Sequence, residues 1–181
     1  MILTKYPYNH FIQPDFLPDD EFNLLYDNLN RLVWELYQKG SYQYWVSSLD
    51  YECPYYQQNQ NVINKLLEEG FVSHLSNLFN IKLSKCKDAT FHKMEAGHFS
   101  KRHTDANKVG EKVRLILYFS QPSDYVGGEL VLYSENTDNS RWKEYKFLPN
   151  TVFGFEMSEK SYHEAKKIEN GVRLCLVLTY M

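Results

Sequence analysis

The hydrophobic positions in the first 80 residues recur at the spacing of helices. Apolar side chains return every three or four residues over residues 18–40 and again over residues 60–79, which predicts two helices that each bury one face. Acidic residues at positions 19–21 suit the positive amino-terminal end of the first helix, and Gly40 is expected to end it. Residues 1–80 are therefore predicted to be a helical support region.

After Ile81 the pattern changes to short runs of β-branched and aromatic residues, separated by turn residues such as Gly127-Gly128 and Asn170-Gly171. Such runs are typical of an antiparallel sandwich or barrel. The predicted strands cover residues 82–95, 112–120, 129–134, 144–147, 152–156, 161–166 and 172–180. We expect one α+β domain, residues 1–181, that is mainly β, with its core in residues 81–181.

The last predicted strand is apolar on both faces. Alternate residues of a strand point to opposite sides, so Arg173, Cys175, Val177 and Thr179 share one face and the leucines between them share the other. Such a strand is expected at the centre of the sheet, with helices over its outer face. Burying Arg173 is costly unless an anion binds it, so the sequence predicts an acidic ligand or a carboxylate partner.

Composition and charge exclude several classes of protein. A charged fraction of 24% and an apolar fraction of 43% are those of a globular protein, and the net charge of -3 argues against nucleic acid as the partner. We expect no membrane association, because no apolar run reaches spanning length and the amino terminus lacks a secretory pattern. The spacing of Cys53, Cys86 and Cys175 supports neither a disulfide framework nor a zinc site, so a reduced, cytoplasmic protein is expected. The oligomeric state stays open.

His103, Asp105 and His163 are the candidate metal ligands. In an extended chain His103 and Asp105 point to the same side, where both can reach one ion, and His163 supplies a third ligand if the barrel brings its strand close. Two histidines and one carboxylate leave open positions on the metal, which is the arrangement of non-haem iron(II) oxygenases. A His-x-Asp triplet also occurs by chance, so this interpretation depends on the residues around it.

Two arginines add to this pattern. Arg173 follows His163 by ten residues across the Asn170-Gly171 turn, which predicts adjacent antiparallel strands with the guanidinium pointing into the barrel, where it can bind a carboxylate through two parallel hydrogen bonds. Arg114 shares a strand face with Tyr118. It is expected either to contact an anionic group of the substrate or to form a structural ion pair at the mouth of the barrel.

Residues 91–181 resemble the catalytic core of the iron(II)/2-oxoglutarate-dependent oxygenases, in their prolyl-4-hydroxylase-like branch. The matching segments are MEAGHFSKRHTD (94–105), VRLILYFS (113–120), GGEL (127–130), HEA (163–165) and VRLCLVLTY (172–180). The segment PYNHFIQPDFLP (7–18) also resembles the lead-in strand and helix of that branch. This resemblance implies a double-stranded β-helix, the jelly-roll core also found in cupins, with the amino-terminal helices on the outer face of one sheet.

The resemblance also implies roles for the site residues. His103, Asp105 and His163 would bind iron(II), while Arg173 and Tyr118 would bind the distal carboxylate of the co-substrate 2-oxoglutarate. The enzyme would consume O2, with ascorbate as reductant, and hydroxylate an unactivated C–H bond. Its substrate would be an amino acid, a peptidyl residue such as proline, or a small natural-product intermediate. Asp105 favours hydroxylation over halogenation, because related halogenases lack that carboxylate.

Several alternatives stay open. Relatives often place a Tyr at the position of Met94, so the hydrogen bond of that Tyr is either absent or made by another residue. Tyr42, Tyr44 and Trp45 are expected in the loop between the two helices, where they either line a substrate entrance or pack the loop. A non-catalytic, cupin-like metal-binding or sensor domain is the alternative function, and a zinc hydrolase is a further one. Neither alternative explains why an arginine would be buried at position 173.

Overall fold

The computed structural model describes residues 1–106 and 110–181, which contain three α-helices and twelve strands. The helices are α1 (Asp19–Asp27), α2 (Pro54–Leu67) and α3 (Glu69–Phe79). Short 3-10 helices are η1 (Leu29–Arg31), η2 (Pro122–Asp124) and η3 (Asp138–Ser140). The strands are β1 (His10–Gln13), β2 (Glu35–Lys39), β3 (Tyr42–Ser48), β4 (Cys86–Glu95), β5 (Phe99–His103), β6 (Val113–Tyr118), β7 (Tyr125–Gly127), β8 (Leu130–Tyr133), β9 (Arg141–Tyr145), β10 (Val152–Glu156), β11 (His163–Ala165) and β12 (Ile168–Tyr180).

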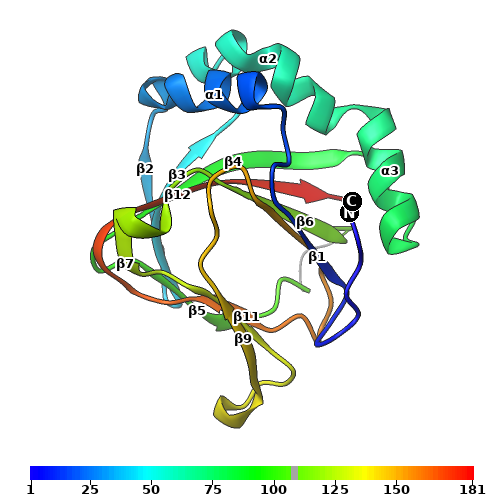
Figure 1. Ribbon diagram of the computed structural model, residues 1–181, viewed down its shortest axis with the longest axis vertical. Coiled ribbons are helices and arrows are strands. Elements are labelled where there is room, and N and C mark those ends of the chain that lie inside the picture. The colour runs from blue at the N-terminus through cyan, green and yellow to red at the C-terminus, as the bar shows by residue number, and fades with distance from the viewer. Residues whose placement is uncertain (107–109) are drawn as a thin grey trace.

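The strands form one curled antiparallel sheet in the order β1-β10-β6-β12-β4-β3-β5-β11-β8-β9. Strand β3 pairs with β4 and also with β5, so the sheet turns there from its larger side to its smaller side. Strand β2 extends β3 at an edge, and β7 pairs with the start of β12. Figure 1 shows the two sides of the resulting jelly roll, with β5, β11 and β9 lying below the layer of β4, β12 and β6. The expected double-stranded β-helix is confirmed.

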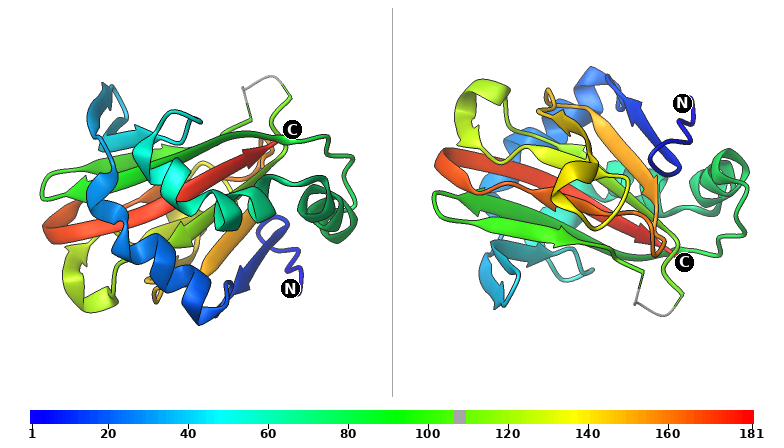
Figure 2. Two further views of the ribbon diagram at one scale, coloured as in Figure 1. Left: turned by 90° about the horizontal axis from the view of Figure 1, so that it is seen from above. Right: turned by 90° about the horizontal axis from the view of Figure 1, so that it is seen from below.

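The helices cover the outer face of the larger side, as Figure 2 shows from above. Strand β12 lies between β4 and β6, and its residues Leu176, Leu178 and Tyr180 are fully buried in the same hydrophobic cluster as the apolar faces of the helices. The Tyr180 hydroxyl donates a hydrogen bond of 2.8 Å to the carbonyl of Leu66 in α2. The prediction of a central strand, apolar on both faces and covered by helices, is therefore correct.

The first predicted helix ends much earlier than expected. Residues 35–39 form β2, which pairs with β3 so that Tyr37 lies opposite Tyr44. Leu32 is buried, but the apolar residues that follow it do not pack against the hydrophobic core: Val33 is 71% exposed and Leu36 is 47% exposed. Gly40, with φ +47°, makes the turn of the β2–β3 hairpin and does not end a helix. Residues 1–80 thus contribute β1, β2 and β3 to the sheet besides the helices.

Two further expectations are corrected. The second helix begins earlier, at Pro54, and is divided into α2 and α3 at Glu68, whose backbone is extended. Asn170-Gly171 lies inside β12, opposite β7, and does not connect two paired strands. Strand β11 pairs with β5 and β8 instead. His163 and Arg173 therefore come from opposite sides of the jelly roll and not from adjacent strands.

Candidate active site

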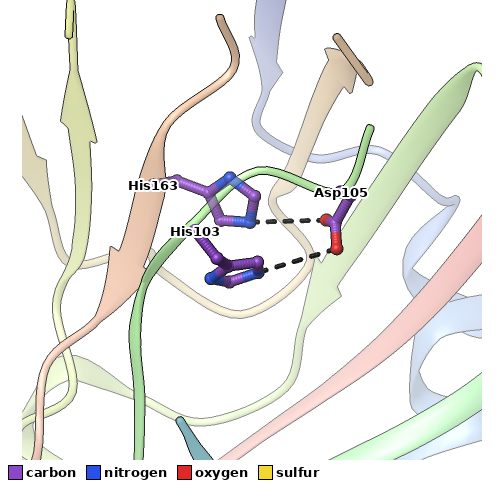
Figure 3. A group of neighbouring side chains, drawn as sticks. All are labelled: His103, Asp105 and His163. Atoms are coloured by element: carbon purple, nitrogen blue, oxygen red, sulfur yellow. Dashed lines mark ion pairs between the residues drawn. The ribbon is translucent and has the colours of Figure 1, made fainter. Parts of the chain in front are cut away.

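His103, Asp105 and His163 meet in the interior of the jelly roll. His103 ends β5 and lies directly opposite His163 of β11, while Asp105 follows β5 by two residues. The ligand atoms of the three side chains lie within 4.8 Å of one another. Figure 3 shows both imidazole rings turned toward the carboxylate, with His103 Nε2 3.6 Å from Oδ1 and His163 Nε2 3.5 Å from Oδ2. The structure brings together the three residues that the sequence singled out.

Backbone carbonyls fix both rings. His103 donates from Nδ1 to the carbonyl of Lys101, and His163 donates from Nδ1 to the carbonyl of Ser161, each over 2.8 Å. A proton on Nδ1 leaves the lone pair on Nε2, which is the atom that faces Asp105. Burial, followed by the neighbouring His103, lowers the pKa of His163 to about 4. His163 is therefore neutral at physiological pH, as a metal ligand has to be.

Arg114 on β6 forms an ion pair with Asp105. Its Nη1 lies 2.5 Å from Asp105 Oδ2, and its Nη2 lies 3.5 Å from Glu111 Oε2. Glu111 in turn lies 2.6 Å from the ammonium group of Lys87. Of the two alternatives for Arg114, the contacts match the structural ion pair. Glu111 was not predicted as part of the site, and its position three residues before Arg114 is too common a pattern to indicate it.

The guanidinium of Arg173 lies deep inside the cavity, and the side chain is only 4% exposed. Nη2 donates to the hydroxyl of Tyr118 over 3.2 Å, and Nη1 contacts Met94 Sδ at 3.0 Å. Nε has no hydrogen-bond partner, and no carboxylate among residues 1–106 and 110–181 forms an ion pair with this arginine. An arginine is always charged, so the carboxylate-partner alternative is excluded for the described residues and a ligand anion is still needed.

One cavity of about 730 Å³ connects the candidate ligands with both arginines. Its wall includes the three candidate ligands together with Arg114 and Arg173. Tyr42 and Tyr44 also line it, from strand β3 and not from a loop between helices as expected. Trp45 points elsewhere and donates to Glu95. The volume lies within the range of small-molecule sites and is large enough for more than one small ligand.

The donor set fits iron(II). The ligand atoms of two imidazoles and one carboxylate lie within 4.8 Å of one another, and the three side chains line a cavity that has room for further ligands. Within the part of the chain that the structure describes, this is the group of ligating side chains close enough to hold an ion. The unpaired Arg173 in the same cavity fits a second, anionic ligand.

Comparison with known proteins agrees with this geometry. The family described as "2OG-Fe(II) oxygenase superfamily" matches residues 89–180. No curated protein matches by sequence. Among solved structures, a prolyl-4-hydroxylase from Pseudomonas putida is 14% identical with a TM-score of 0.71, and covers 94% of this chain and 91% of its own.

Two other solved structures share the fold. A prolyl hydroxylase from Trichoplax adhaerens, in complex with a hypoxia-inducible-factor peptide fragment, is 17% identical with a TM-score of 0.71, over 95% of this chain and 83% of its own. An α-ketoglutarate-dependent epimerase from nogalamycin biosynthesis is 11% identical with a TM-score of 0.66, over 95% and 77%. The family match covers half of the sequence and includes both histidines, Asp105 and Arg173. The chain belongs to the 2OG-Fe(II) oxygenase superfamily and is an iron(II)- and 2-oxoglutarate-dependent dioxygenase.

Proposed function

We propose that His103, Asp105 and His163 hold the iron(II) ion and that Arg173, with Tyr118, holds the distal carboxylate of 2-oxoglutarate. The meeting of the three ligand atoms and the neutral state of His163 support the first assignment. The single observation that carries the second is the buried guanidinium of Arg173, which lacks a carboxylate among the described residues. A dicarboxylate supplies that anion, and the planar guanidinium can bind it through two hydrogen bonds.

We propose that the reaction is hydroxylation of an unactivated C–H bond. Iron(II) and 2-oxoglutarate, when bound, would direct one atom of O2 into succinate as CO2 is lost, and the other atom into the hydroxyl group of the product. The protein's own part is to keep His163 neutral, to hold Asp105 against Arg114 and to orient the co-substrate at Arg173. Ascorbate is proposed as the reductant that maintains iron(II).

The substrate is proposed to be a small molecule or a short peptide segment. The prolyl hydroxylases and the epimerase that share the fold act in different chemistries, so the fold alone does not select among substrates. The cavity volume of about 730 Å³ supports a small-molecule substrate beside the co-substrate.

We also propose that residues 1–181 act as one oxygenase domain in the cytoplasm. Support for one domain comes from β1, β2 and β3, which join strands of the second half in the same sheet. Support for a reducing compartment comes from the three cysteines, all free. No helix among the described residues has the length and apolar character needed to cross a membrane.

The test is turnover of the co-substrate. Purified protein with iron(II), ascorbate and O2 should convert 2-oxoglutarate to succinate, slowly even without substrate. His163→Ala should abolish this conversion, because it removes a ligand that no other histidine replaces. His74→Ala is the matched control, since His74 is exposed on α3 and should keep wild-type activity. Succinate formation that survives in His163→Ala would contradict the assignment, as would its absence from the wild-type protein.

A further inference from the structure

The β2–β3 hairpin presents an aromatic face to the cavity. Tyr42, Tyr44 and Val46 alternate along β3 and so point to one side, and Tyr37 lies opposite Tyr44 on β2. All four line the cavity. The rings of Tyr37 and Tyr44 stack with centroids 5.4 Å apart, and Tyr42 meets Tyr44 edge-on at 6.4 Å. We call Tyr37, Tyr42 and Tyr44 the tyrosine wall; its hairpin is visible at the β2 and β3 labels in Figure 1.

The tyrosine wall begins beside the reaction centre. The ring of Tyr42 contacts the imidazole of His103 edge-on, with centroids 4.9 Å apart. Farther along β3, Tyr44 stacks on His92 at 4.6 Å. Pairing of Tyr42 with Ser100 holds the hairpin against β5, the strand that ends at His103. A molecule lying on this wall would therefore extend from the proposed metal site toward the rim, where Tyr37 is 39% exposed.

The phenol groups of the wall are available to a ligand. Among the described residues, none hydrogen-bonds to the hydroxyl of Tyr37, Tyr42 or Tyr44, whereas the buried Tyr55 and Tyr180 donate to backbone carbonyls. A phenol hydroxyl can both donate and accept a hydrogen bond, so each of the three groups can bind a ligand in either direction.

The charged groups of the cavity are used elsewhere or lie at its rim. Arg114 is paired with Asp105 and Glu111, and Arg173 lies at the end of the cavity proposed for the co-substrate. Lys39 and Asp88 line the cavity but are exposed to solvent. The wall itself therefore offers flat aromatic surface and neutral hydrogen-bonding groups, with no buried cation to neutralise an anionic substrate.

We propose that the tyrosine wall binds the primary substrate and that this substrate is a neutral small molecule with a ring that carries hydroxyl or carbonyl oxygens. The ring packs against the aromatic side chains of the wall, and its oxygens exchange hydrogen bonds with the free hydroxyls. This inference rests on the proposed function, because it assumes that the Arg173 end of the cavity is filled by 2-oxoglutarate.

Ligand-observed NMR tests the proposal with protein that carries zinc(II) in place of iron and saturating 2-oxoglutarate, so that no turnover occurs and the Arg173 end is filled. Four probes are used. Benzyl alcohol and cyclohexanemethanol are neutral rings, 1-hexanol is a neutral flexible chain, and benzoate is a charged ring. Saturation transfer should reach both neutral rings. Benzoate and 1-hexanol should bind about tenfold more weakly than the neutral rings. Desolvation of the charge opposes binding of benzoate, and ordering of the flexible chain opposes binding of 1-hexanol.

Substitutions in the tyrosine wall show where the neutral ring probes bind. Tyr44→Leu and Tyr37→Leu should weaken binding of both neutral rings about fivefold, the size of one aromatic contact. Tyr42→Phe removes a hydroxyl and keeps the ring beside His103, and it should weaken binding by a smaller factor. Tyr51→Leu is the control, because Tyr51 is 76% exposed and lies outside the cavity wall. Thermal unfolding of each variant verifies that it is folded.

Three outcomes would overturn the inference alone: no binding of the neutral rings while 2-oxoglutarate binds, equal or tighter binding of benzoate or 1-hexanol, or affinities that the Tyr37 and Tyr44 variants leave unchanged. The 2-oxoglutarate signal in the same spectra distinguishes failure of this inference from failure of the proposed function. If that signal shows no transfer, the proposed function fails and this inference fails with it.

Discussion

At the scale of single residues, Arg114 holds Asp105 in an ion pair. Asp105 lies beyond the end of β5, outside any paired strand, and its Oδ2 is held by the guanidinium 2.5 Å away. Arg114 is itself anchored by the buried Glu111, which Lys87 pairs from the surface. The four charges alternate in sign, so each one lowers the cost of burying the next.

Replacing Arg114 by Gln should therefore weaken metal binding. Loss of the group that orients a ligand typically costs at least about tenfold in metal affinity, and we expect that size of effect here. Anaerobic titration with cobalt(II), followed by its visible absorption, measures the affinity without turnover. Arg141→Gln, at an exposed position on β9, is the control and should bind cobalt(II) normally. Unchanged or tighter binding in Arg114→Gln would show that Arg114 does not position Asp105.

The sequence predicted the ligands better than it predicted their neighbours. His103, Asp105 and His163 could be named because their spacing in the chain and their resemblance to one family agree. Glu111 could not, because one acidic residue near an arginine is common in any sequence and only the fold decides which pair meets. The alternatives for Arg114 likewise depended on a contact between β6 and the segment after β5.

At the scale of elements, most strands of the second half were predictable, whereas β5 and the edge hairpin were not. The strand at residues 152–156 was predicted with its observed bounds, because its residues are buried on both sides. Residues 35–39 carry helical spacing by chance, and the pairing of β2 with β3 outweighs that local preference. The tyrosine wall exists only because this segment is a strand, so the sequence left its role open.

Strand β10 also contains a position where packing leaves no room for a side chain. A Cβ at Gly154 would lie 2.3 Å from Phe11 Cε1 and 2.7 Å from Leu115 Cδ2. We expect Gly154→Ala to lower the free energy of unfolding by about 1–3 kcal/mol, the usual cost of overpacking a core. Urea denaturation measures this.

The matched control is Gly70→Ala in α3, where a new Cβ would have nothing within 4 Å. This change should raise stability by up to about 0.5 kcal/mol, since Ala is the better helix former and the position is near the start of the helix. Equal effects of the two alanine substitutions would contradict the packing described for β10.

At the scale of the whole molecule, the jelly roll places the proposed metal ligands and the proposed co-substrate arginine on opposite walls of one cavity. The smaller side supplies His103 and His163, and the larger side supplies Arg173 from its central strand. The prediction that His163 and Arg173 lie on adjacent strands was wrong, yet both residues reach the same cavity because the sheet curls at β3. Curling of this kind is set by long-range pairing, which no local pattern reports.

The central claim, that Arg173 holds the co-substrate of a metal site formed elsewhere in the fold, makes a separable prediction. Removing the charge of Arg173 should weaken the binding of 2-oxoglutarate and leave the affinity for the metal unchanged. Because two hydrogen bonds to a carboxylate are lost, Arg173→Gln should weaken 2-oxoglutarate binding by about 100-fold or more. Iron(II) affinity should stay within about twofold of wild type, since the side-chain contacts of Arg173 are with Met94 and Tyr118 and not with the three proposed ligands.

The most direct measurement is an anaerobic titration of wild-type protein and Arg173→Gln with iron(II) and 2-oxoglutarate, followed by the metal-to-ligand charge-transfer absorption. Wild-type protein should develop the band with both components, and Arg173→Gln should need far more 2-oxoglutarate at the same iron(II) concentration. Absence of the band from the wild-type protein, or an equal loss of iron(II) and 2-oxoglutarate affinity in the variant, would contradict the account.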